Sequence, residues 1–175
     1  MFDLDAVARF SPVHDEGRMA HFGKLHMADL TDEYLIGECR GVLGKYAGGC
    51  VSETDKIFLV REMRAACSTV PELVRSIENE LSFGSEVLGE AAPAWAPAFM
   101  ERLASMSESE WRSDAILSTI KSFAAERYLK GREIFHPVRI FATGHSRGAP
   151  IGIILSCIGM EETLARISRM ALRQN

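Results

Sequence analysis

The chain of 175 residues lacks a long hydrophobic run. Its most apolar stretch, residues 151–158, is much shorter than the roughly 18 residues that a membrane span needs. The first five residues contain two acidic side chains and no basic one, which is unlike a secretory signal. These absences predict a cytoplasmic protein that does not associate with membranes.

Paired cysteines and cofactor motifs are also missing. The four cysteines, Cys39, Cys50, Cys67 and Cys157, form no CxxC pair. In a reducing compartment we expect them to be free, buried thiols. A zinc site that joined Cys39 and Cys50 to a nearby histidine would have irregular ligand spacing, which argues against such a site. The sequence has no HExxH, Walker or GxGxxG motif, and we therefore expect neither a metal nor a cofactor.

Acidic and basic side chains are unevenly distributed, although the net charge is only −4. Residues 1–111 carry ten basic against nineteen acidic side chains, whereas residues 112–147 carry seven against three. A polyanion would most readily dock on this second, basic segment. A solvated helix face with ordinary lysines and arginines explains the same excess, so the charge alone does not separate the two interpretations.

Helix signals run along most of the chain, while strand signals are scarce. Capping boxes begin at Ser52, Thr69 and Ser107, and the last of these predicts a long helix that reaches about Leu129. An all-α fold is therefore the simplest interpretation. We expect helices that begin near residues 15, 31, 52, 69, 99, 107 and 150, followed by a last helix that contains Leu164 and Ile167.

Proline and glycine mark the predicted ends of elements in the last third of the chain. Lys130 and Gly131 fit the end of the long helix, as a cation followed by a C-cap glycine. Residues 138–141 alone resemble a strand. The same stretch fits a short helix that has Pro137 at its first position and Gly144 just after its last.

The first and last helices are predicted to be amphipathic. Met19, Phe22 and Met27 are the apolar residues of the first helix. In the last helix Leu164 and Ile167 point inward. Arginines stand on another face of that helix: Arg166, Arg169 and Arg173.

A segment rich in alanine and proline, residues 91–98, reads as a connector. It lies close to the change in charge. We therefore predict two small, packed helical subdomains, one of residues 1–90 and one of residues 91–175.

The stretch from Gly144 to Gly148 fits G-x-S-x-G, the nucleophile elbow of serine hydrolases. That elbow needs a strand before the serine and a histidine base that follows it along the chain. No histidine follows Ser146, and His145 at the turn itself could not easily act as an oriented base. We therefore do not expect a hydrolase.

Spaced motifs over most of the chain resemble one family. Residues 130–144 read K-G-R-x-x-x-H-P-V-R-x-x-x-T-G, followed by Pro150 and by G-M-E-E-T-L-A-R-I at 159–167. Residues 2–19 add F-D-L, F-S-P and D-E-x-R-M, and Trp111 stands where the family has a tryptophan. This pattern is similar to the C-terminal anticodon-binding region of bacterial glutamyl-tRNA synthetases. The resemblance implies a helical cage that engages the anticodon arm of tRNA(Glu).

The family's catalytic half, with its ATP-binding motifs, is missing from the chain. The resemblance therefore implies a binding module that does not aminoacylate tRNA alone, and that is part of or derived from a glutamate–tRNA ligase. Alanine stands at position 66, where the family often has an arginine that reads the anticodon, and Arg64 lies two residues away. The residues expected to contact RNA, with no role for DNA, are Arg64, Lys130, Arg132, Arg139, Thr143, His145, Ser146 and Arg147.

Structural roles compete with several of these assignments. Arg139 also suits an internal ion pair between helices, and Thr143 with Gly144 also suits a helix C-cap. Trp111 and Phe123 fit core packing better than base stacking. The rival function is a protein-interaction module that no longer binds tRNA and instead binds a separate synthetase catalytic domain or another partner.

Overall fold

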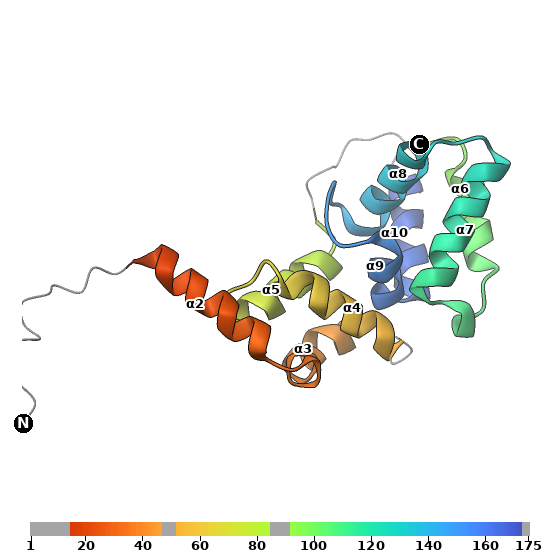
Figure 1. Cartoon of the computed structure of the whole chain (residues 1–175). Coiled ribbons are helices and arrows are strands. Elements are labelled where there is room, and N and C mark those ends of the chain that lie inside the picture. Colours follow the sequence, from red (N-terminus) through yellow and green to blue (C-terminus); the bar gives the residue numbers. More distant parts are fainter. Residues whose placement is uncertain (1–14, 47–51, 85–91, 173–175) are drawn as a thin grey trace, which may run out of the picture.

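The structure, a computed structural model, describes residues 15–46, 52–84 and 92–172, with side chains to residue 169. These residues form helices and no strand, which confirms the all-α prediction (Figure 1). The helices are α2 (Glu16–Asp29), α3 (Asp32–Tyr46), α4 (Glu53–Arg64), α5 (Val70–Leu81), α6 (Ala96–Ala104), α7 (Ser113–Glu126), α8 (Gly131–Thr143), α9 (Ile151–Ile158) and α10 (Met160–Leu172), with a short 3₁₀ turn, Glu108–Glu110.

The helices gather into two lobes that share helix α9. Helices α3, α4 and α5 pack on one another, and α6, α7, α8 and α10 surround the other side of α9 (Figure 1). Helix α9 contacts α4 and α5 on one side and α7, α8 and α10 on the other. Because nearly every side chain of α9 is buried, it forms the common core of both lobes.

The predicted connector only partly matches the structure. Helix α6 already begins at Ala96, inside the stretch 91–98. The division at residues 90 and 91 falls outside the described residues, as do the motif residues before Asp15. The two-domain division therefore stays a prediction.

Side-chain caps explain where several helices begin. The Thr69 hydroxyl accepts a hydrogen bond from the Glu72 amide at 3.3 Å, and Pro71 lies in the first turn, as the sequence predicted. The box at Ser107 also forms, but it opens only the 3₁₀ turn. Helix α7 begins later, at Ser113, so the prediction of one long helix from Ser107 was wrong.

The junction between α7 and α8 also differs from the prediction. Helix α7 ends at Glu126, and Lys130 is the N-cap of α8 rather than the end of the preceding helix. The Glu133 carboxylate accepts from the Lys130 amide at 2.6 Å and stabilises this start. Residues 138–141 are helical, but Pro137 lies inside α8 and not at its first position.

Buried polar groups fix the angles between helices. Asp55, 4% exposed, accepts hydrogen bonds from the amide and the hydroxyl of Ser113 and from the Ser156 hydroxyl. These three contacts join α4 to the start of α7 and to α9. Trp111 donates its indole N–H to the Leu155 carbonyl at 2.9 Å from a buried position, which confirms its core role.

The two amphipathic predictions were partly wrong. Met27 is buried, but Met19 and Phe22 are 62% and 63% exposed, because α2 projects from the body of the protein (Figure 1). In α10, Ile167 is buried as expected, but Arg166 is also buried, at 3% exposure. The Arg166 guanidinium pairs with Glu162 at 2.8 Å, donates to a backbone carbonyl in α8 and covers the Tyr46 ring.

The cysteines follow the sequence prediction where they are described. Cys39, Cys67 and Cys157 are free and buried, while Cys50 lies outside the described residues. Burial raises the pKa of the Cys39 thiol to about 11 and that of Cys157 to about 12. The described residues contain no metal-binding cluster of histidine, cysteine and acidic side chains. None of their helices is long and apolar enough to span a membrane.

Candidate nucleic-acid interface

A short loop after α8 presents three of the predicted contact residues. Gly144 ends the helix in the left-handed conformation, at φ 72°, and the loop then carries His145, Ser146 and Arg147. Ser146 and Arg147 are exposed, whereas His145 is half-buried. A helix, not a strand, precedes Ser146, which removes the basis for a nucleophile elbow.

Glu80, near the end of α5, holds this loop from the other lobe. Its Oε1 accepts a hydrogen bond from the Ala149 amide at 2.8 Å and lies 3.6 Å from the Arg139 guanidinium. Arg139 also donates to the Ala149 carbonyl. A Cβ added to Gly148 would lie 1.8 Å from the same Oε1, so a side chain there would displace Glu80. The carboxylate and the loop are thus closely fitted.

Arg139 is therefore bound within the fold. Its side chain is 12% exposed, and burial lowers the pKa of the guanidinium while Glu80 opposes that shift. The group stays charged at neutral pH, because an arginine is not deprotonated in proteins. This internal ion pair matches the structural alternative that the sequence left open for Arg139.

Thr143 and Gly144 also pack against the end of α5. The buried Thr143 hydroxyl donates to the Arg139 carbonyl at 2.9 Å and accepts from the His145 amide at 3.1 Å. The Gly84 amide donates to the Thr143 carbonyl at 2.7 Å, and a Cβ on Gly144 would lie 1.9 Å from the Gly84 carbonyl oxygen. Thr143 and Gly144 thus form the helix C-cap and shape the loop.

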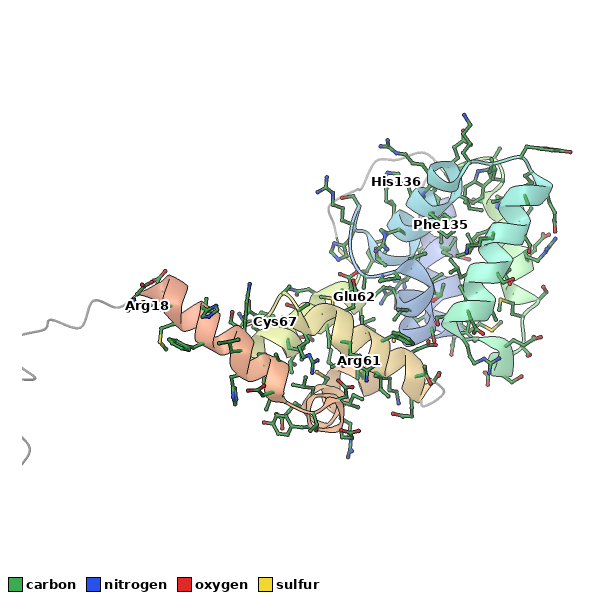
Figure 2. All side chains as sticks on the ribbon, viewed as in Figure 1. Arg18, Arg61, Glu62, Cys67, Phe135 and His136 are labelled. Carbon is green, nitrogen blue, oxygen red and sulfur yellow. The ribbon has the colours of Figure 1, made fainter. Side chains whose placement is uncertain are left out.

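The other predicted cations stand at the opposite end of α8. Lys130 and Arg132 are exposed, and neither forms an ion pair within the described part of the chain. Helix α8 has 13 residues, so roughly 20 Å separates its two ends. Figure 2 labels two residues of the helix between these ends, Phe135 and His136, in the lobe opposite α2. The candidate residues therefore divide into a loop group and a helix-start group.

Arg64 lies apart from both groups, on α4. It donates to the Leu30 carbonyl at 3.1 Å and lies 3.6 Å from an oxygen of Asp32. The Arg61 guanidinium donates a hydrogen bond to the same Asp32 carboxylate. This hydrogen bond is the main reason that the pKa of Asp32 is lowered. Arg64 thus fastens the junction of α2 and α3, and the structure does not bring it together with α8.

A sequence model described as the anticodon binding domain matches residues 51–171. The chain belongs to the anticodon-binding domain family. Glutamate–tRNA ligases of Burkholderia thailandensis and Gluconobacter oxydans are 24% and 25% identical to it over 95% and 96% of its length. The chain spans little more than a third of these relatives, 37% and 38%.

Solved structures show the same fold. The glutamate tRNA ligase of Elizabethkingia meningosepticum, solved in complex with its amino acid, superimposes with a TM-score of 0.73 at 18% identity. The match covers 99% of this chain and 36% of that ligase. The resemblance to the anticodon-binding region of glutamyl-tRNA synthetases is thereby confirmed, and it extends over nearly the whole chain.

Sequence reasoning missed the residues that hold the loop in place. Glu80 is one of nineteen acidic residues before position 112, and nothing near it in the sequence points to Ala149, 69 residues away. The contact between Nε2 of His145 and the Asn79 carbonyl, at 3.2 Å, involves a backbone group, so the type of residue at position 79 gives no hint of it. Only Gly144 and Gly148 hinted that the backbone adopts an unusual conformation there.

Proposed function

We propose that the chain is a tRNA-binding module that engages the anticodon arm of tRNA(Glu). One observation carries the proposal beyond family membership. The loop that exposes Ser146 and Arg147 is held by hydrogen bonds to Glu80, Gly84 and Asn79, and it continues a helix that begins with the exposed cations Lys130 and Arg132. A pre-formed polar loop beside a basic surface suits an RNA hairpin, whose unpaired bases are read one by one.

The two groups of residues have different parts in this proposal. Arg147, Ser146 and His145 contact unstacked loop bases, because their side chains donate and accept hydrogen bonds to base edges. Lys130 and Arg132 hold phosphates, which fix the position of the RNA without reading its sequence. Arg139 and Thr143 affect RNA binding indirectly, because they shape the loop. Arg64 also acts indirectly, because it stabilises the junction between α2 and α3.

Salt-dependent tRNA binding tests the proposal. The chain is expected to shift tRNA(Glu) on a native gel at low salt, and its affinity should fall steeply as the salt rises. Arg147→Ala should weaken binding, and Lys130→Ala should reduce the salt dependence by about one released counterion. Arg40→Ala on α3 removes an equal charge from an exposed site far along the chain and is the matched control. Absence of any shift at low salt would refute the proposal.

A second function is favoured by the apolar surface of α2. Met19, Phe22 and Leu25 are 62%, 63% and 52% exposed on this projecting helix, whose outer end carries Arg18 (Figure 2). The relatives are more than twice as long as this chain. We propose that a separate synthetase catalytic domain binds here, so that the module supplies tRNA binding and the partner supplies the chemistry.

Co-purification tests this second function. The chain should form a complex with a glutamyl-tRNA synthetase catalytic domain, and Phe22→Asp should abolish the complex. Phe58→Asp, at a residue of α4 that is 51% exposed, is the matched control and should leave the complex intact. A complex that survives Phe22→Asp, or no complex with the unaltered chain, contradicts the assignment.

A further inference from the structure

The side chain of Tyr128, in the turn between α7 and α8, has no structural role within the described part of the chain. Its side chain is 95% exposed and makes no hydrogen bond, ring contact or ion pair with the described residues. Most exposed tyrosines lay at least one face of the ring against the protein, since the ring is largely apolar. Here both faces of the ring are open to solvent.

The backbone at Tyr128 makes its presence there more unusual. Its φ is 55°, the left-handed region, which among the described residues no other non-glycine residue adopts. The Leu129 amide donates to the Ala124 carbonyl at 2.9 Å and the Tyr128 amide to the Ala125 carbonyl at 3.3 Å. This pair of bonds is a Schellman motif with Tyr128 at the C′ position, where glycine is the usual and less strained residue.

The side chains around Tyr128 are cationic. Arg127, Lys130 and Arg132 are exposed, and Arg127 lies over the Phe123 ring at 4.6 Å. The two nearby carboxylates are already engaged. Glu126 binds Arg102 through two hydrogen bonds of 3.1 and 2.8 Å, and Glu133 accepts from the Lys130 amide. The turn therefore presents an open aromatic ring, with three exposed cations within four residues of it along the chain.

We propose that Tyr128 is a stacking platform for an unpaired RNA base, with Lys130 and Arg132 on the adjoining phosphates. Single-stranded nucleic acid is held by this combination of aromatic faces and a basic track. The proposal rests on the tRNA-binding function above and extends the interface from the loop of His145 to Arg147 along α8 to its start. An RNA that engages both ends of α8 must span the roughly 20 Å between them.

Three variants of Tyr128 separate stacking from charge and from backbone strain. Tyr128→Ala removes the ring, Tyr128→Phe keeps it, and Tyr128→Gly removes both the ring and the strain at positive φ. Affinity for the tRNA(Glu) transcript is measured by fluorescence anisotropy at two salt concentrations, and the melting temperature of each variant is recorded. The full chain is used throughout.

Loss of the ring should weaken binding by about 5- to 150-fold, the range that one base–aromatic stack provides. Tyr128→Phe should bind within about twofold of the unaltered chain. Tyr128→Gly should melt at a higher temperature yet bind as weakly as Tyr128→Ala, so that instability cannot explain the loss. The salt dependence should stay unchanged in all three, because no phosphate contact is removed.

Two results would overturn the stacking role. Tyr128→Ala could bind as tightly as the unaltered chain, or Tyr128→Phe could lose as much affinity as Tyr128→Ala, which would assign the effect to the hydroxyl. Either result leaves the tRNA-binding function standing. If the unaltered chain bound no tRNA at low salt, the tRNA-binding function would itself be refuted, and the stacking role with it.

Discussion

At the scale of single residues, Glu80 holds the candidate loop from another helix, although its own side chain is largely buried. It is 12% exposed in its side chain and pairs with an equally buried Arg139. It also accepts from the Ala149 amide. One carboxylate thus contacts both the last turns of α8 and the end of the loop that presents Arg147, and helps to give the loop its shape.

Glu80→Ala should destabilise the fold and weaken RNA binding together. The change removes the buried ion-pair partner of the Arg139 guanidinium and the acceptor of the Ala149 amide, a loss of about 3 kcal/mol in the free energy of unfolding. Urea denaturation measures this loss. Glu78→Ala removes an exposed pair with Lys45 at 3.2 Å and should change stability by less than about 1 kcal/mol. Equal effects of the two changes would contradict the role given to Glu80.

The buried thiols should be protected from reaction in the folded state. Because burial raises the pKa of Cys39 to about 11 and of Cys157 to about 12, the thiolate fraction at pH 8 is on the order of one in a thousand or less. In a Cys50→Ser variant, Ellman's reagent should label no thiol rapidly before denaturation and three thiols in 6 M guanidinium chloride. Rapid labelling of the folded variant would show that these cysteines are accessible.

At the scale of elements, local sequence signals predicted some helix starts and ends correctly and missed others. The box at Thr69 and the glycine at position 144 act through backbone groups a few residues away, and each was predicted correctly. Lys130 with Gly131 was misread as an end because a cation before glycine fits a C-cap. The actual end of α7 depends on Tyr128 at positive φ, which the residue type argues against.

The angles between helices depend on contacts between residues distant in sequence, which no local pattern reveals. Asp55 binds Ser156, 101 residues away, and Arg166 reaches the Ala142 carbonyl. Burial of Arg166 was missed for this reason, since an arginine on a helix ordinarily faces water. Exposure of Met19 was missed because an apolar residue in a helix ordinarily faces a core.

Asp55→Ala should loosen the joint between α4, α7 and α9. The change removes three hydrogen bonds and leaves the Ser156 hydroxyl buried without its partner, so we expect a loss of about 2–4 kcal/mol in the free energy of unfolding. Chemical denaturation followed by circular dichroism measures it. Asp114→Ala is the matched control, because its contact with Arg112 is exposed and long, at 3.9 Å. If Asp55→Ala left the free energy of unfolding unchanged, the proposed role of Asp55 in joining α4, α7 and α9 would be refuted.

At the scale of the whole molecule, two lobes meet at α9, and the lobe of α6, α7, α8 and α10 carries a basic surface at the start of α8, formed by Lys130 and Arg132. The net charge of −4 conceals this surface, which only the distribution along the chain revealed. The family could be predicted from motif spacing, and the all-α fold from the helix signals along the chain. The packing of the loop after α8 against α5 could not be predicted, because it joins two segments that are distant in the sequence and show no pattern linking them.

The most direct test compares two halves of one tRNA. Affinities of the chain for the isolated anticodon stem-loop of tRNA(Glu) and for the acceptor minihelix are measured by anisotropy at the same salt concentration. An anticodon-arm module should bind the stem-loop nearly as tightly as the whole tRNA and the minihelix at least about tenfold more weakly, a difference of about 1.4 kcal/mol. Equal affinity for the two halves, or tighter binding of the minihelix, would contradict the account.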